Sequence, residues 1–587
     1  MQRVGIICAG TTLPAWQTRC LEHLMAIPDV ELTLLVADGG DHHAPMMPES
    51  KQSSTRTTLW STYASRFLHW RAVALRPVDC SHLLVRTSMQ RCRLVPGRGG
   101  MWRISGEDVE ELTRLELDAI LHLGHGRLEG EILRLSPHGV WALHHLEGGE
   151  LASGLGCFWA VFRGARVIEA VLQRLTDDGD VTLHEGAFRG NPSSFSGTLD
   201  EILLGAAHWP ARVCSAILAG AGTEREAPSK QDLVPAPRVP TNAELGRFIA
   251  TLALRAAKSS FTRLLFSDQW NVGIADVPIE SFLEPGARPS IRWLGSPSVH
   301  HFVADPFGVI DGDDLIVLVE ALRYRTNRGY IAVLDHRGGT ASRTGAVIES
   351  VGHMSYPFLL EYEGATYCIP ETADTGEVRL YRASSFPHRW EHCATLLPDF
   401  PAVDATVVRH GERWWLFCTA KGSVPYAAQT TLYAWYAPSL FGPWSPHVLN
   451  PLKTDVRSAR PAGTPFVHAG RLYRPAQDCS RVYGGSITIN EVLTLTPMAF
   501  AEQPVAVVKP DAAGPYPNGL HTLSRCGSMT LIDGKRRRII PPASWRKVRT
   551  LVASVATRMP LLTQASPGQR TATSSQSDEA TTTQERT

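Results

Sequence analysis

The sequence lacks several features that mark well-defined protein classes. No run of eighteen or more uninterrupted apolar residues occurs, so no membrane-spanning helix is predicted. The 11 cysteines include no Cys-x-x-Cys pair, which disfavours a zinc knuckle or a disulfide framework and indicates reduced thiols. Charge of one sign is also missing: 58 basic residues face 57 acidic ones, so no overall field attracts nucleic acid. The first apolar run is too short for a secretory signal, and we expect a cytoplasmic protein.

Within this ordinary composition, 587 residues are too many for one hydrophobic core. The first part alternates between β-rich and helical patterns, with a strand at 3–8, a helix at 13–27 and a strand at 31–37. Such alternation predicts an α/β domain with a parallel sheet over residues 1–220. Residues 40–105 show no clear pattern, and we interpret them as an irregular excursion.

A linker and a helix separate this domain from the rest. Residues 221–240 are rich in proline and poor in apolar residues, which is typical of an extended linker. Thr241 and Glu244 match a capping box, and apolar residues then recur at helical spacing over 241–264. Packing of this connecting helix on a domain is favoured, and peripheral contact with an anionic membrane surface is the alternative.

An internal repeat dominates residues 265–540. Its copies start 48 to 60 residues apart, at Asp305, Tyr356, Asp404, Thr464 and Gly519. This spacing suits one four-stranded blade, so the repeat predicts an all-β, five-bladed β-propeller. Residues 541–587 are basic at first and then rich in Ser, Thr and Gln, which predicts a disordered tail.

Equivalent positions of the repeat carry polar groups that the blades themselves do not require. Because the inner strands of a propeller run along one axis, these side chains are expected to face a common funnel. So many buried carboxylates would raise one another's pKa, which favours an active centre over simple turn caps. The candidate catalytic residues are Asp305, Glu371 and Asp404, and the candidate substrate-binding residues are Glu320, Arg460, Asp478 and Tyr483.

The Asp305-Pro-Phe motif together with Asp404 resembles the five-bladed furanosidase-type glycosidases. The resemblance implies that Asp305 is a general base and that Asp404 tunes the pKa of its partner. The family's fourth-blade Glu, the general acid, is missing, and Glu371 or Glu320 are the candidates to replace it. A transferase that acts on a sugar phosphate does not need this acid, because Arg460 can neutralise a leaving phosphate.

A wider segment, about 268–540, resembles the N-terminal propeller module of glucosamine inositolphosphorylceramide transferases. The motifs that carry this resemblance are Trp270-Asn-Val-Gly-Ile, Ile369-Pro-Glu, Tyr473-Arg-Pro-Ala-Gln-Asp and Tyr483-Gly. It implies that the propeller handles a sugar or a sugar nucleotide.

Segments of the first domain, mainly between 115 and 190, resemble the formyltransferase fold of methionyl-tRNA and sugar N-formyltransferases. The resemblance implies a Rossmann-like domain, 10-formyltetrahydrofolate as formyl donor, and His144 or His145 with Asp177 as catalytic residues. The family's Asn is replaced by Ala142 or Leu143, depending on which His is aligned. Loss of one oxyanion donor costs about 3 kcal/mol in comparable sites.

The sequence therefore predicts a carbohydrate-active transferase of cell-envelope or exported polysaccharide biosynthesis, with its site in the propeller funnel and no metal. N-formylation of an amino sugar by the first domain is one alternative. A non-catalytic carbohydrate-binding scaffold is the other.

Overall fold

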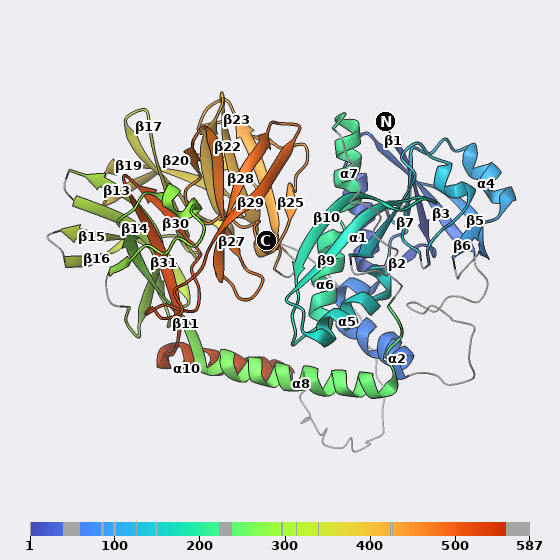
Figure 1. Ribbon diagram of the computed structural model, residues 1–587, viewed down its shortest axis with the longest axis horizontal. Helices are drawn as coiled ribbons and strands as arrows, with labels where there is room; N and C mark the ends of the chain where they lie inside the picture. Colours follow the sequence, from blue (N-terminus) through green and yellow to red (C-terminus); the bar gives the residue numbers. More distant parts are fainter. Residues whose placement is uncertain are drawn as a thin grey trace, which may run out of the picture.

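The computed structural model describes residues 2–558, except for 39–58, 84–86, 98–100, 125, 147–150, 222–236, 295–296, 313, 338–339, 423 and 425. Two bodies lie side by side, an α/β domain and a propeller, and the long helix α8 (Asn242–Leu265) runs beneath both (Figure 1). The capping box predicted at its start is present, because the Thr241 hydroxyl accepts from the Glu244 amide and the Glu244 carboxylate accepts from the Thr241 amide.

The α/β domain is built on one eight-stranded sheet in the order β10-β9-β8-β7-β1-β3-β5-β6. The central strands are parallel, as predicted, and β6, β9 and β10 are antiparallel additions at the edges. The strands are β1 (Gln2–Cys8), β3 (Val30–Asp38), β5 (Ser88–Pro96), β6 (Trp102–Ile104), β7 (Ala119–His122), β8 (Val140–His145), β9 (Val167–Leu175) and β10 (Val181–Arg189). This arrangement is an α/β fold; it does not by itself identify a formyltransferase.

Two apolar cores cover the two faces of this sheet. Successive side chains of a strand point to opposite faces, so Ile6 belongs to one core and Ile7 to the other, and Leu34 and Leu35 divide in the same way. The helices that build these layers are α1 (Ala15–Met25), α2 (Leu59–Thr62), α3 (His69–Arg71), α4 (Gly106–Thr113), α5 (Leu155–Arg163), α6 (Phe195–Ala206) and α7 (Trp209–Leu218).

The interpretation of residues 40–105 as an irregular excursion was wrong for its second half. Strand β5 pairs in parallel with β3, and β6 pairs with β5, so residues 88–104 extend the sheet. Their basic and polar residues conceal the strand because β5 lies near the sheet edge, where most of its side chains are not buried. A short pair of strands, β2 (Thr12–Pro14) and β4 (Pro77–Asp79), lies outside the main sheet.

The second body confirms the five-bladed propeller: among the described residues, four blades have four strands each and the third has five. The first blade contains β13 (His301–Asp311), β14 (Asp314–Arg323), β15 (Arg328–Arg337) and β16 (Thr340–Ile348), and the second contains β17 (Ser355–Tyr362), β18 (Ala365–Glu371), β19 (Val378–Ser385) and β20 (Arg389–Leu397). The third contains β21 (Ala402–His410), β22 (Arg413–Ala420), β23 (Thr431–Ala437) and β24 (Ser445–Pro446), and β25 (Lys453–Thr454) also pairs with β23. The fourth contains β26 (Phe466–His468), β27 (Arg471–Asp478), β28 (Ser486–Leu495) and β29 (Phe500–Val508). The first strands of the fifth, first, second and third blades, β30 (Leu523–Cys526), β13, β17 and β21, contact one another in turn and so line the axis.

The fifth blade joins both ends of the propeller sequence. Its order is β12-β11-β31-β30, where β11 (Phe266–Ala275) and β12 (Ile291–Leu294) come first in the chain and β30 (Leu523–Cys526) and β31 (Met529–Ile539) come last. Strand β11 pairs with β31 over ten residues and thereby closes the ring. The internal repeat does not reveal this closure, because β11 and β12 are not part of a repeat copy.

The segment after the propeller differs from the predicted tail, because Pro541–Arg558 forms helix α10. Its Lys547 ammonium donates to the carbonyls of Arg263 and Phe266 at the end of α8, 2.8 and 2.6 Å away. The disorder predicted beyond this helix falls on residues 559–587, outside the described residues. None of the described helices is long and apolar enough to cross a membrane.

The two bodies share an interface at the third and fourth blades. The Trp209 indole of α7 donates to the Thr454 hydroxyl at 3.2 Å, and the Val456 amide donates to the Ala187 carbonyl at 2.9 Å. Ala216 of α7 belongs to an apolar cluster that is otherwise made by the propeller. The α/β domain therefore packs directly against the propeller as well as being linked to it by α8.

Candidate functional site

Three blades have the same backbone irregularity at the start of the first strand. Asp305, Tyr356 and Asp404 are non-glycine residues with φ of 51°, 45° and 53°, and the strand register shifts at each of them. A left-handed conformation of this kind costs about 1–3 kcal/mol per residue and persists only where the surroundings enforce it. The recurring bulge therefore holds two carboxylates and a phenol in equivalent places around the axis.

The second strands supply a further ring of polar groups. Ala304 pairs with Glu320, Ser355 with Glu371 and Val403 with Thr419, each one residue before a bulge. The corresponding residues of the fourth and fifth blades are Gln477 and Asp533. The predicted convergence of Asp305, Glu320, Glu371 and Asp404 is present, since these carboxyl groups lie close enough to influence one another's pKa.

Asp404 is the best-paired carboxylate of the cluster. Arg460 donates to its two oxygens at 2.7 and 3.3 Å, and the Gln477 amide donates to Oδ2 at 2.8 Å. Both side chains of the Arg460–Asp404 pair are nearly buried. Arg460 also donates to the Tyr483 hydroxyl at 3.3 Å and lies over its ring at 5.0 Å from the centroid. A fork of this kind fixes the orientation of the guanidinium and leaves one of its edges beside Tyr483.

Asp305 is held by groups that the sequence interpretation missed. Its Oδ1 accepts from the Thr522 hydroxyl at 2.7 Å, and the His521 ring nitrogen lies 3.6 Å from the same atom. His521 is in turn 2.5 Å from Asp533. A signal for Asp533 existed, because the fifth repeat copy ends Met-Thr-Leu-Ile-Asp, in the position that holds Glu320 in the first copy.

Burial separates the protonation states of these groups. Burial raises the pKa of Asp305 to about 6, although His521 opposes the shift. Burial, followed by the charge of Asp404, raises the pKa of Glu371 to about 8. Burial also raises the pKa of Glu320 well above its usual range. Burial alone would lower the pKa of His521, but Asp533 and Asp305 outweigh it and raise that pKa. At neutral pH the cluster therefore contains both a protonated and an ionised carboxyl group.

Glu371 is the most accessible carboxyl of the cluster. It is only partly buried, whereas Asp305 and Asp404 are 5% and 2% exposed. The Ser355 hydroxyl donates to Glu371 at 3.2 Å, and the partly exposed His353 lies 3.3 Å from Glu320. Glu371, His353 and Tyr483 form the partly exposed margin of the cluster, and Arg460, which is 9% exposed, contacts this margin through the Tyr483 hydroxyl.

Asp478, predicted to bind substrate, lies apart from the hydrogen bonds of Asp404. Its carboxylate accepts from the Ser480 amide at 2.9 Å and from the Ser486 hydroxyl at 3.3 Å, so it caps the turn between β27 and β28. Side chains alternate along a strand, so Gln477 faces Asp404 and its neighbour Asp478 does not.

The only group of three potential metal ligands among the described residues is Asp305, His521 and Asp533, whose ligand atoms lie within 4.8 Å of one another. The close contact between His521 and Asp533 already accounts for this arrangement as an ion pair.

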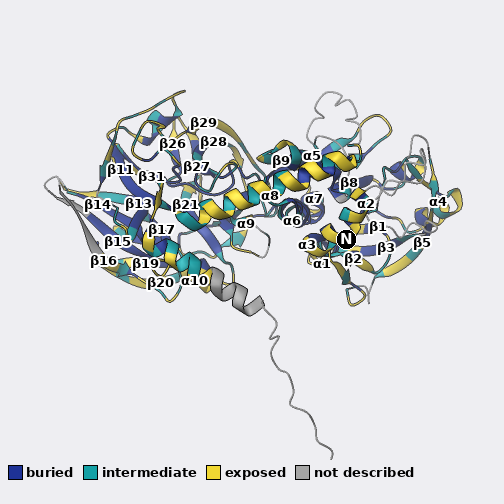
Figure 2. Ribbon diagram, turned by 90° about the horizontal axis from the view of Figure 1, so that it is seen from below, coloured by how far each residue is buried: buried dark blue, intermediate teal, exposed yellow. Residues whose placement is uncertain are grey.

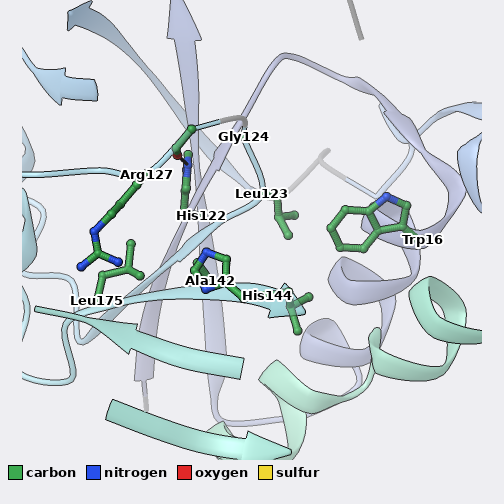
Figure 3. Close-up of a pocket in the computed structure, with 10 residues that line it drawn as sticks. Trp16, His122, Leu123, Gly124, Arg127, Ala142, His144 and Leu175 are labelled. Atoms are coloured by element: carbon green, nitrogen blue, oxygen red, sulfur yellow. Dashed lines mark hydrogen bonds between the residues drawn. The ribbon is translucent and has the colours of Figure 1, made fainter. Parts of the chain in front are cut away.

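The α/β domain has its own small cavity, in which His144 and Ala142 lie on the same face of β8 (Figure 3). The His144 ring is 3.0 Å from the Gln173 amide oxygen. Arg127, on the opposite side of the cavity, donates to Asp180 at 2.7 Å. The residue two positions before His144 is therefore Ala142, which has no side-chain amide of the kind that the formyltransferase resemblance requires at this position.

The structure does not bring the other predicted residues of this domain into the cavity. His145 faces the opposite side of the sheet, and a side chain at Gly156 of α5 would lie 2.6 Å from its ring. Neither ring nitrogen of His145 has a hydrogen-bond partner among the described residues, and burial lowers its pKa to about 4. Asp177 forms a partly exposed ion pair with Arg134, and Asp180 lies closer to the cavity instead.

Comparison with known proteins finds relatives of the propeller. Residues 288–514 match the family model "Glucosamine inositolphosphorylceramide transferase 1, N-terminal". The rice (Oryza sativa subsp. japonica) glucosamine inositolphosphorylceramide transferase 1 is 38% identical over 216 residues, covering 36% of this chain and 28% of that protein. The Arabidopsis thaliana protein of the same name is 34% identical over 212 residues, covering 35% and 27%. The chain thus spans little more than a quarter of the length of these relatives.

Solved structures with a related arrangement are more distant. A thermostable family-43 glycoside hydrolase has a TM-score of 0.27 at 11% identity, covering 36% of this chain and 77% of that one. A family 117 glycoside hydrolase from Zobellia galactanivorans has a TM-score of 0.28 at 13% identity, covering 46% and 91%.

Proposed function

We propose that the propeller transfers a glycosyl unit from a phosphate-activated sugar to a hydroxyl group, at the margin of the cluster, beside Glu371, Arg460 and Tyr483. The observation that carries this proposal is the gathering of Asp305, Glu371 and Asp404 around the axis, with Arg460 bound to Asp404, in surroundings where burial raises the pKa of Glu371 to about 8 and that of Asp305 to about 6. Two carboxyl groups whose pKa values are pushed apart are the usual basis of acid and base roles at a glycosidic centre.

The relatives support a sugar-transferring role. The matched region contains Asp305, Glu371, Asp404 and Arg460, and the curated relatives are named as transferases. Their name contains an amino sugar, glucosamine, and a lipid, inositolphosphorylceramide. We extend to this chain the class of acceptor, a hydroxyl on a phosphate-bearing lipid headgroup.

Each residue then has a distinct part. Asp305, ionised above pH 6, accepts the proton of the attacking hydroxyl. Glu371, protonated up to about pH 8, donates a hydrogen bond or a proton to the departing oxygen. Arg460 contacts the phosphate through the edge of its guanidinium beside Tyr483, while Asp404 fixes its orientation.

The test is incubation of the purified full chain with a panel of nucleotide sugars and phosphoinositol acceptors, with detection of product by mass. Glu371→Gln keeps the shape of the side chain but removes the acid, so we expect product formation to fall by about 10²- to 10⁴-fold. Glu361→Gln, an exposed position on β17, is the matched control and should keep full activity. Equal activity in the two variants would exclude Glu371 as the acid.

A sugar-binding scaffold without catalysis is a second candidate, favoured by the burial of the cluster. Asp404 and Asp533 are almost inaccessible and already have internal partners. This candidate predicts sugar binding by calorimetry that Glu371→Gln leaves intact, with no product from any donor of the panel.

Formyl transfer by the α/β domain is not supported by the residues of its cavity. Ala142 offers no amide to an oxyanion, and Asp180 is engaged by Arg127. Adding 10-formyltetrahydrofolate and an amino sugar to the same panel tests this alternative directly.

A further inference from the structure

The outward face of α8 is apolar although nothing among the described residues covers it. Leu254 and Phe261 are 73% and 63% exposed, and they lie seven residues apart, about two helical turns, on one side of the helix. Ala250 and Ala257 are exposed between and beside them. In the view from below, α8 crosses the molecule with its outward residues exposed (Figure 2). The inward face is anchored by Leu245 and Phe248, which are buried against the α/β domain.

Positive charge borders this apolar stripe. Arg247 and Lys258 are both exposed. Arg247 lies seven residues before Leu254, in line with the stripe, with its guanidinium 5.4 Å from the centroid of the Phe162 ring, and Lys258 lies four residues after Leu254, beside the stripe. Helices α8 and α10 together contain eight Lys or Arg residues, and their only acidic residue is Glu244. Glu244 is used at the start of α8, where it pairs with Arg238. Four of these basic residues are exposed, Arg247, Lys258, Arg263 and Arg549, so the described surface of the two helices has a net positive charge in a chain whose overall charge is close to neutral.

An exposed aromatic residue extends the same surface on α10. Trp545 is 69% exposed and follows closely on Ile540 and Ala543, which belong to the apolar cluster that contains Trp270. The Ser544 hydroxyl donates to the Leu265 carbonyl, so the two helices are fixed to each other. The exposed Arg549 lies four residues, about one turn, after Trp545, and tryptophan with a neighbouring cation is a typical combination at a membrane interface.

This surface lies at the same end of the propeller as the carboxylate cluster. Strand β31 passes from Asp533 to Ile539 and then enters α10, and β11 leaves α8 at Phe266 and reaches Trp270 beside His521. Six residues of strand, about 20 Å, separate Asp533 from Ile539. The helices thus lie at the end where the funnel's polar residues are found, and not at the opposite rim.

We propose that the outward face of α8 together with Trp545 of α10 docks on an anionic phospholipid surface and brings the funnel to lipid headgroups. The role of this surface in bringing the funnel to lipid rests on the proposed function, whereas the observations that indicate membrane binding do not depend on it. The apolar stripe is narrow and partly alanine, so insertion alone is weak and the basic residues must contribute attraction to anionic lipid. Binding should therefore require negative lipid and weaken with salt.

The experiment is flotation of the full chain with phosphatidylcholine vesicles, with and without phosphatidylserine. We expect binding only to the phosphatidylserine vesicles, lost at high salt. The double variant Leu254→Asp/Phe261→Asp and the double variant Arg247→Glu/Lys258→Glu should each reduce binding by about tenfold or more. Val467→Asp, which changes an exposed apolar residue on the β26–β27 hairpin, is the matched control and should bind like the unmodified chain. Unchanged thermal unfolding of all variants confirms that folding is intact.

Two results would overturn the proposal. One is equal flotation of the Leu254→Asp/Phe261→Asp variant and the unmodified chain. The other is absence of flotation together with a dimer, seen by light scattering, that the same variant dissociates, since a second copy would then cover the stripe. Transfer to a water-soluble acceptor should be unaffected by the helix variants, so failure of the transferase assay and failure of vesicle binding are separate outcomes.

Discussion

The α/β domain and the propeller both bury histidine, with opposite consequences. His145 lies in an apolar core without a partner among the described residues, and burial lowers its pKa to about 4, so it is neutral. His521 is equally buried but lies between Asp305 and Asp533, which raise its pKa and favour the charged form. Burial without a nearby opposite charge favours the neutral form of a histidine, whereas burial beside carboxylates favours its charged form. The difference places the capacity for acid–base work in the propeller.

Breaking the best ion pair of the propeller should have the largest effect. Arg460→Met leaves the buried Asp404 without its cationic partner, and we expect a loss of about 3–5 kcal/mol in the free energy of unfolding. Urea unfolding at neutral pH measures it. Arg457→Met is the control, because the Arg457 side chain is about half exposed in its ion pairs with Glu169 and Asp455, which should contribute no more than about 1 kcal/mol. Equal losses in the two variants would contradict the difference in burial.

The second prediction concerns acid sensitivity of the α/β domain. The unfolded chain protonates His145 near its ordinary pKa, but the folded domain does not until about pH 4, so stability decreases as the pH falls from 6.5 to 4. At the lower limit this amounts to about 3 kcal/mol. His145→Leu should remove that dependence, measured as the free energy of unfolding at neutral pH and near pH 4. The pH dependence of stability that arises from His521 has the opposite sign. Because the pKa of His521 is raised in the folded protein, its charged form stabilises the fold at low pH, and this stabilisation is lost as the pH rises through the raised pKa. An unchanged acid slope in His145→Leu would refute the isolated burial of this ring.

The propeller fold and its candidate site could be predicted from the sequence where a sequence motif recurs in several blades. The blades are recognisable because each copy contains its own strand and turn, and aligned copies bring Asp305, Glu371 and Asp404 to one place. His521 and Asp533 were not predicted as site residues, because the fifth copy is degenerate and the other half of its blade, β11 and β12, lies more than 200 residues earlier in the chain.

The sequence could not show whether His144 or His145 faces the cavity. Residues 140–143 are apolar on both faces of a central strand, so no alternation shows which histidine faces the cavity. The helix at Pro541–Arg558 was missed for a different reason, because its basic residues were read as solvent-exposed while its first turn packs on the propeller through Ile540 and Ala543.

A smaller effect is expected on the pH profile of the proposed glycosyl transfer. Asp305 must be ionised and Glu371 protonated, so activity should be highest between pH 6 and 8 and fall about tenfold for each pH unit beyond either limit. Initial rates across this range with a fixed donor test it. A profile that is flat through both limits would exclude this pair as the acid and the base.

The smallest effect is expected in the other cavity. His144→Gln changes a residue that contacts Gln173 in the α/β domain, far along the chain from the funnel. Glycosyl transfer should remain within about twofold of the unmodified rate, because no interaction with the transition state is removed. A loss of tenfold or more would mean that the α/β domain takes part in the reaction, and the contrast between the two bodies would fail.

The pairing of β11 with β31 has a consequence for biosynthesis. Strand β11 leaves the ribosome some 250 residues before β31, so about four blades emerge while its hydrogen-bonding edge still awaits a partner. An unpaired edge invites pairing with another nascent chain. The ring can therefore close only after β31 has been synthesised, and a chain that is truncated before Met529 lacks the strand that pairs with β11.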